Sequence, residues 1–126
     1  MSHFTTIDTQ VRDVQALKSA CAEMSLVVEE NAVARGYARN THKGVLVIRL
    51  KGLYDIAVNK QQDGTYGLTT DWWDGHVERE VGKNYGKLLQ LYGVHKAQIE
   101  ARKKGYTTRR QALGDGSIKL VIGGVR

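Results

Sequence analysis

Two aspartates and a tryptophan are the residues whose types and spacing best suggest chemistry. They lie in GLYDIAVNKQQDGTYGLTTDWWDG, residues 52–75, which reads as two strands joined by a tight turn. A pairing that keeps the apolar residues of both strands on one face sets Asp55 directly opposite Asp71, with Trp73 beside them. Paired carboxylates can hold a metal ion or divide acid–base roles when their pKa values are pushed apart.

The same pair also has structural interpretations. Like charges directly opposed on a sheet repel each other, so something must offset them. Arg49 or a C-terminal arginine could cross the face, or the carboxylates could accept hydrogen bonds from neighbouring backbone N–H groups. Trp73 is an interface anchor if it is exposed, and a packing residue if a helix covers it.

Positive charge is concentrated in residues 76–126. That segment carries 11 Lys and Arg against 4 Asp and Glu, whereas residues 1–75 carry 8 against 9. The densest run, ARKKGYTTRRQ, holds five cations and a tyrosine: Arg102, Lys103, Lys104, Tyr106, Arg109 and Arg110. The cations can stabilise a helix C-terminus, bind an acidic protein, or hold phosphates while the tyrosine stacks on a base. RNP-type, KH and zinc-finger signatures are absent, which favours the first two interpretations.

The remaining reactive residue types match no known motif. His3, His42, His76 and His95 have no metal-ligand spacing, and GxSxG, Walker-type and GxGxxG motifs are absent. Cys21 is the only cysteine, which excludes an internal disulfide, and we expect it to be a buried structural thiol on a helix. We therefore name no catalytic residue, metal ligand or cofactor.

Hydrophobic periodicity predicts the elements of the first half of the chain. Asp13 is expected to N-cap a helix whose apolar face runs from Val14 to Met24. Polar, glycine-broken residues 30–44 indicate a loop or a ragged edge, and the apolar run 45–50 is the best candidate for a central strand. Further strands are expected at 3–11, at 26–30 and in the two arms of the 52–75 hairpin, joined by the loop Gln62-Asp63-Gly64.

The second half predicts one long helix and a second hairpin. Apolar residues recur every three or four positions from Val77 to Tyr92, where Gly93 ends or kinks the helix and 94–104 extend it. Asp115-Gly116 indicates a two-residue turn between the last strands. The order β-α-β-β-β-β-α-β-β predicts an α+β fold with two amphipathic helices on one face of a mainly antiparallel sheet.

The length of 126 residues and the composition fit one soluble domain, residues 1–126. The start of the chain lacks the basic and apolar regions of a signal peptide. Its apolar runs are too short for a membrane span, so we expect no membrane partner.

Four stretches together resemble a known family. They are MSHFTTIDT, ARGY, the YDIAVN…DGTY…TTDWW hairpin and KLLQLYGVHKAQIEARKKG. Across nearly the whole chain they resemble the plastid and cyanobacterial hypothetical open reading frame thirty-five family, a conserved domain of unknown function. The resemblance implies a cytoplasmic location in a bacterium or a stromal one in a plastid. It also implies a protein partner, with an AAA-type ATPase or a ferredoxin-like protein as candidates, but no catalytic residues. The WWDG sequence and the basic last third depart from the family pattern.

We therefore predict a non-catalytic binding or accessory module for a protein partner. Its contact surface is expected around Asp55, Asp71 and Trp73, or along the basic run from Arg102 to Arg110. The alternatives are a metal- or small-molecule-dependent enzyme that uses the Asp55/Asp71 pair, and a basic nucleic-acid-binding module.

Overall fold

The computed structural model describes residues 4–125, so His3, at the start of the first predicted strand, lies outside the described residues. The strands are β1 (Phe4–Asp8), β2 (Val27–Arg35), β3 (Thr41–Arg49), β4 (Ile56–Lys60), β5 (Tyr66–Asp71), β6 (Tyr106–Ala112) and β7 (Ile118–Val125). The helices are α1 (Val14–Glu23), α2 (Glu78–Val81) and α3 (Gly86–Lys103), with short 3-10 turns η1 (Tyr37–Arg39), η2 (Trp73–Gly75) and η3 (Lys83–Tyr85).

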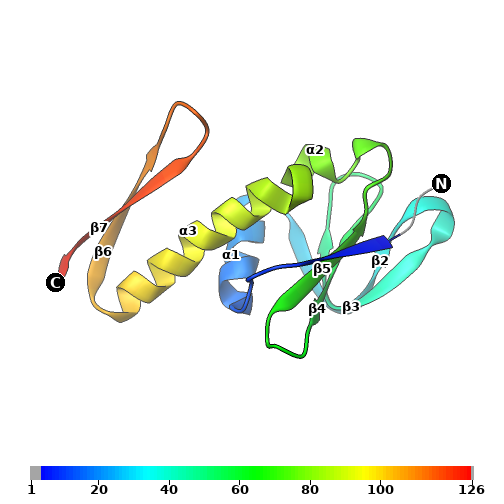
Figure 1. Ribbon diagram of the computed structural model, residues 1–126, viewed down its shortest axis with the longest axis horizontal. Helices are drawn as coiled ribbons and strands as arrows, with labels where there is room; N and C mark the ends of the chain where they lie inside the picture. The colour runs from blue at the N-terminus through cyan, green and yellow to red at the C-terminus, as the bar shows by residue number, and fades with distance from the viewer. Residues whose placement is uncertain (1–3, 126) are drawn as a thin grey trace.

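The predicted α+β fold is confirmed. Five antiparallel strands form one sheet in the order β1-β5-β4-β3-β2, and β6 pairs with β7 in a separate two-stranded ribbon (Figure 1). Apolar residues of all three helices pack on one face of the larger sheet and form the main core with Ile48, Ile56 and Leu68. Among the described residues, no helix is long and apolar enough to cross a membrane.

The register predicted for the β4–β5 hairpin is confirmed. Val58 pairs with Leu68 and Ile56 with Thr70. The Gln61 N–H donates to the Thr65 carbonyl at 2.8 Å, which leaves the three-residue loop that the sequence predicts. Gly64 adopts a φ of 87°, the left-handed conformation that such a loop requires. Burial selects this register because a one-residue shift would move every side chain to the other face.

The prediction of a loop or ragged edge at residues 30–44 is wrong for most of the segment, because only residues 36–40 form a turn and the ladder of the edge strand β2 is interrupted only at Asn31. Strand β2 continues to Arg35, β3 begins at Thr41, and the Gly36 N–H donates to the Asn40 carbonyl at 2.8 Å across a tight tip. The polar composition of the segment hid a long hairpin, because β-strand preference depends on cross-strand pairing more than on local sequence.

The second long helix is interrupted where the pattern predicts continuity. Helix α2 ends at Val81 and is capped by Gly82, whose φ of 84° and ψ of 168° only glycine adopts readily. Helix α3 then starts at Gly86 and passes through Gly93 without a break. The apolar residues predicted for one face still point to the core, because Val77, Val81, Tyr85 and Leu88 are fully buried. Asp13 is the predicted N-cap of α1 and accepts from the Ala16 N–H at 3.1 Å.

The sheet face opposite the helices is covered by the sheet itself. The tip of the β2–β3 hairpin bends toward the start of β1, at the opposite edge of the sheet, where the rings of Phe4 and His42 lie 5.3 Å apart. Small residues line the resulting space: Ala34, Val47 and Ala57 are fully buried in a second cluster. This curl brings residues of β2 over the ends of β4 and β5.

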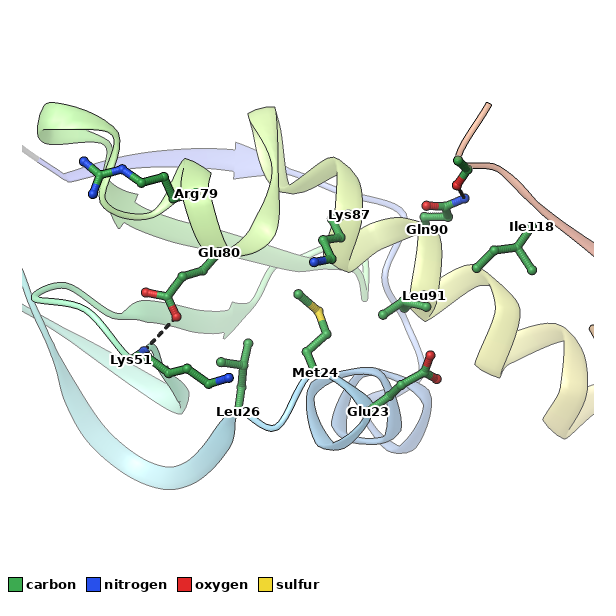
Figure 2. Close-up of a pocket in the computed structure, with 11 residues that line it drawn as sticks. Glu23, Met24, Leu26, Lys51, Arg79, Glu80, Lys87, Gln90, Leu91 and Ile118 are labelled. Atoms are coloured by element: carbon green, nitrogen blue, oxygen red, sulfur yellow. Dashed lines mark hydrogen bonds between the residues drawn. The ribbon is translucent and has the colours of Figure 1, made fainter. Parts of the chain in front are cut away.

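The C-terminal hairpin lies beyond α3 and away from the larger sheet (Figure 1). Its turn has three residues, 114–116, rather than the predicted two, because the Leu113 N–H donates to the Ser117 carbonyl at 3.0 Å. Together with α1 and α3 the turn borders a hollow of about 560 Å³ (Figure 2). We call this the lysine hollow, after Lys51 and Lys87 at its rim.

Two glycines of the α2–α3 segment give opposite stability predictions. A Cβ at Gly82 would lie 2.8 Å from the Lys87 backbone nitrogen, whereas one at Gly93 would meet nothing within 4 Å. We expect Gly82→Ala to lower the free energy of unfolding by about 1–3 kcal/mol. Gly93→Ala should raise it by about 0.5–1 kcal/mol, because alanine loses less entropy in a helix. Urea unfolding of both variants measures this, and equal effects of the two substitutions would contradict the interrupted helix.

Candidate functional site

Asp55 and Asp71 stand opposite each other at the end of the β4–β5 hairpin, as the sequence predicts. The ladder between these strands ends at the pair Ile56 and Thr70, and the next residues in the same register are the two aspartates. Both side chains are fully buried. Their charges must therefore be compensated inside the protein.

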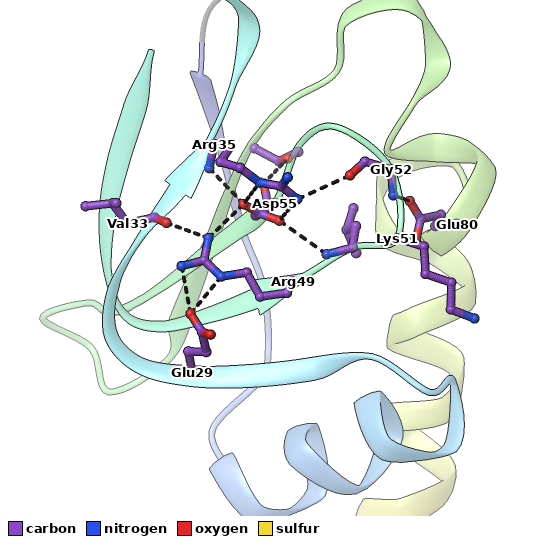
Figure 3. A network of polar contacts seen from close by, with 10 residues as sticks. Glu29, Val33, Arg35, Arg49, Lys51, Gly52, Asp55 and Glu80 are labelled. Carbon is purple, nitrogen blue, oxygen red and sulfur yellow. Dashed lines mark hydrogen bonds and ion pairs between the residues drawn. The ribbon is translucent and has the colours of Figure 1, made fainter. Parts of the chain in front are cut away.

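Two arginines neutralise Asp55 (Figure 3). Arg35 of β2 donates to the carboxylate through Nε and Nη2, both at 2.8 Å, and through its backbone N–H at 2.9 Å. Arg49 of β3 donates through Nη1 at 2.8 Å, and the Leu50 N–H donates at 3.3 Å. Burial acts to raise the pKa of Asp55, but the hydrogen bonds from Arg35 and Arg49 outweigh it and lower the pKa. The structural interpretation foresaw Arg49 but not Arg35.

The arginine cluster joins three strands. Arg49 also contacts Glu29 of β2 at 2.7 Å and donates to the Val33 carbonyl at 2.7 Å. The Asp55 backbone N–H donates to the Arg35 carbonyl at 3.0 Å. These bonds hold the outer half of β2 against β3 and the start of β4, so Asp55 serves to hold the curl of the sheet.

Asp71 joins two loops and has no cationic partner among residues 4–125. One of its carboxylate oxygens, Oδ2, accepts from the Tyr37 N–H at the tip of the β2–β3 hairpin, and Oδ1 accepts from the Trp73 N–H, each at 3.0 Å. Hydrogen bonds from backbone N–H groups were one of the two structural explanations that the sequence suggested for the Asp55/Asp71 pair. The carboxylate fixes the positions of two aromatic residues that lie 36 positions apart in the chain.

Tyr37 and Trp73 form an exposed aromatic pair. Their ring centroids lie 5.4 Å apart, and the two residues are 41% and 42% exposed. Each is followed by a residue with positive φ, Ala38 at 54° and Asp74 at 56°, a conformation that costs free energy for residues other than glycine. Trp72 instead packs against the main core, where its ring centroid lies 4.8 Å from that of Tyr85.

The structure divides the basic run. Arg102 and Lys103 end α3, Lys104 caps it, and these three side chains are exposed. Arg109 and Arg110 are neighbours on β6, so their side chains leave opposite faces of the strand. Of these two arginines, Arg109 is exposed and Arg110 is half-buried. Tyr106 is half-buried beside Ala101 and Ile122.

Arg110 is a structural cation. It donates to both carboxylate oxygens of Glu23, at the end of α1, at 2.8 and 2.9 Å. His95 of α3 contacts the same carboxylate at 2.7 Å. The hydrogen bond from Arg110, helped by the one from His95, lowers the pKa of Glu23 to about 2. This cluster fastens the C-terminal hairpin to both helices, so Arg110 is engaged within the chain.

Cys21 is buried, as expected, and burial raises the pKa of its thiol to about 12. Across residues 4–125, the structure has no group of three or more His, Cys, Asp and Glu side chains arranged to hold a metal ion.

Sequence reasoning missed Arg35 and Tyr37, which complete the site. Both belong to the ARGY stretch inside the segment that was expected to be a loop. The alternation of small and large residues before Gly36 was the available signal, because it is compatible with a strand that ends in a turn.

The fold and these clusters define a small α+β protein whose buried carboxylates organise an exposed aromatic surface. The chain belongs to the family described as "Protein of unknown function (DUF1257)", which matches residues 20–121. It is 32% identical over 126 residues to "Uncharacterized protein ycf35" of Pyropia yezoensis, across 97% of this chain and 96% of that relative. No solved structure matches the chain. The family resemblance found in the sequence is therefore confirmed.

Asp55→Asn tests whether the arginine cluster supports the fold. We expect the free energy of unfolding near neutral pH to fall by about 2–4 kcal/mol, because charge-assisted bonds are lost while both arginines keep some access to water. The folded pKa of Asp55 is lowered, so its contribution is complete above the unfolded value of about 3.9 and is lost as the pH falls below it. The difference between wild type and variant should therefore shrink below about pH 4. Asp74→Asn, which changes an exposed aspartate outside the arginine cluster, is the control. A stability difference between wild type and Asp55→Asn that grows in acid would contradict the structural role of Asp55.

Arg109→Gln and Arg110→Gln separate the two faces of β6. Arg110→Gln should lower stability by about 1 kcal/mol or less, the range of partly exposed ion pairs, and Arg109→Gln should change it little. Because the pKa of Glu23 is lowered from 4.5 to about 2, the stabilisation by Arg110 is complete above about pH 4.5 and is lost as the pH falls toward 2. Thermal unfolding measured across this range tests both points. Equal destabilisation by the two variants would show that Arg110 has no special contact.

Proposed function

We propose that this protein is a non-catalytic binding module for another protein, and that Tyr37 and Trp73 form the centre of its contact surface. The observation that carries the proposal is the Asp71 carboxylate, which accepts one backbone N–H from each aromatic residue. Tyrosine and tryptophan are enriched among the residues that dominate binding energies at protein interfaces. A pair that is already fixed before binding loses less entropy when a partner arrives.

The neighbouring residues support a protein partner. Arg39, another residue type enriched at interface centres, is exposed two residues after Tyr37 at the same hairpin tip. Ala38, Arg39 and Asp74 adopt positive φ values, a conformation that costs free energy for residues other than glycine and that recurs at functional sites. In this proposal Asp55 and Asp71 are positioning residues, and the partner contacts the aromatic rings.

The geometry supports an enzyme built on the aspartate pair less well. A carboxylate offers about four acceptor positions, and Asp55 already accepts from five N–H groups. A metal ion or substrate would have to displace these donors. The nucleic-acid alternative would use Arg102, Lys104 and Arg109, since Arg110 is held by Glu23 and Tyr106 is half-buried.

The finer features that the family resemblance implies remain proposals. An AAA-type ATPase or a ferredoxin-like protein is the first partner to test, in a bacterial cytoplasm or a plastid stroma. We also propose that residues 1–126 act as one domain, because the cluster of Glu23, His95 and Arg110 joins the C-terminal hairpin to the two main helices.

Partner capture tests the aromatic surface. Tagged protein is incubated with native lysate, with and without nuclease, and retained proteins are identified by mass spectrometry. Trp73→Ala and Tyr37→Ala should each reduce retention of the partner about tenfold or more, as expected for central interface residues. Leu53→Ala is the control, because Leu53 is 60% exposed and belongs to neither aromatic loop.

Thermal unfolding of the same variants shows whether they stay folded. Retention that survives both aromatic substitutions would contradict the proposal. Retention that disappears with nuclease would favour the nucleic-acid alternative.

A further inference from the structure

The lysine hollow combines an apolar floor with a basic rim (Figure 2). Leu26 and Leu91 form part of the floor and are buried, with 7% and 8% of their surface exposed. Met24 and Ile118 complete it and pack against the main core. Lys51, after β3, and Lys87, in the first turn of α3, line the hollow from opposite sides and are exposed.

The two lysines keep their charges uncompensated within the part of the chain that the structure describes. Ten ion pairs join side chains of residues 4–125, and none includes Lys51 or Lys87. In Figure 2 the Lys87 ammonium group points into the space between α1 and α2. An unpaired ammonium group beside an apolar surface attracts an anion more strongly than one in open water does.

The two carboxylates that line the hollow are already engaged. Glu80 accepts from the backbone N–H groups of Lys51 and Gly52, at 2.7 and 2.9 Å. Glu23 is held by Arg110 and His95, as described above. The Glu80 carboxylate is thus held against the backbone of Lys51 and Gly52. The charge of Glu23 is offset by Arg110. Three cations, Lys51, Arg79 and Lys87, line the hollow against these two carboxylates, so its rim carries a net positive charge.

From this arrangement we propose that the lysine hollow binds a small amphiphilic anion, a molecule with a phosphate or carboxylate group on an apolar body. The anionic group would lie between Lys51 and Lys87, and the apolar body would cover the floor. The volume of about 560 Å³ is in the usual range for small-molecule sites. Gln90 donates to the Gly116 carbonyl at 3.2 Å and keeps the hairpin turn at the edge of the hollow.

This site is separate from the aromatic surface. Neither Tyr37 nor Trp73 is among the residues that line the hollow. Arg79, at its edge, donates to the Asp74 carbonyl at 2.7 Å, beside Trp73. Ligand binding here therefore does not depend on the proposed function, and either proposal can fail without the other.

Titrations of ¹⁵N-labelled full-length protein followed by NMR test the proposal. The probes are octyl phosphate, octanoate, octanol and inorganic phosphate, each below any concentration at which micelles form. Octyl phosphate or octanoate should shift the amide signals of Lys51, Lys87 and Leu91 with saturation. Octanol and inorganic phosphate, which each lack one half of the ligand, should bind at least about tenfold more weakly.

Matched double variants separate a specific site from general charge attraction. Lys51→Gln with Lys87→Gln should weaken octyl phosphate binding at least about tenfold. Lys60→Gln with Lys83→Gln removes the same charge from exposed positions outside the hollow and should leave the affinity unchanged. Spectra of the free variants establish that both keep the wild-type fold.

Three results would overturn the proposal. The first is the absence of saturable shifts around the hollow with both anionic amphiphiles. The second is octanol binding as tightly as octyl phosphate, which would show that the lysines contribute nothing. The third is equal weakening by the two double variants, which would show that only net charge matters.

Discussion

The buried carboxylate of Asp55 sets the main constraint on the sheet face opposite the helices. A charge taken out of water must be matched by nearby cations and hydrogen-bond donors. The cations come from Arg35 of β2 and Arg49 of β3, so the β2–β3 hairpin has to bend over the end of β4 to deliver them. The bend is possible because residues at the contact, such as Ala34 of β2 and Ala57 of β4, are small and fully buried, so the strands can approach closely.

The same bend determines where the exposed aromatic residues lie. Once the tip of the hairpin rests over the end of β5, the Tyr37 N–H comes within hydrogen-bond distance of Asp71, which also accepts from the Trp73 N–H. The two aspartates thus have different roles although they lie opposite each other on neighbouring strands. Asp55 holds the sheet in its curved shape, and Asp71 converts that shape into a fixed pair of surface rings.

At the other end of the molecule, a two-stranded ribbon depends on its contacts with the helices. An isolated hairpin is marginally stable in water, and this one is joined to α1 and α3 through Glu23, His95 and Arg110. Its turn also borders the lysine hollow. The positive charges of residues 76–126 are therefore used differently. Arg110 holds the ribbon against the helices, whereas Lys87 lines the hollow and has no ion-pair partner among the described residues.

Local patterns in the sequence determined the elements that depend on near neighbours. The loop glycine and the alternation of apolar residues fix the register that opposes Asp55 and Asp71, and the spacing from Val77 to Leu88 fixes a buried face even though Gly82 interrupts the helix. The tertiary structure alone decided what the carboxylates do and which cations stay unpaired among residues 4–125. Arg35 lies 20 residues from Asp55 and Arg110 lies 87 from Glu23, so no periodic pattern links these pairs. Charge compensation is decided by distance in space, which the chain establishes only when the sheet has curled and the hairpin has docked.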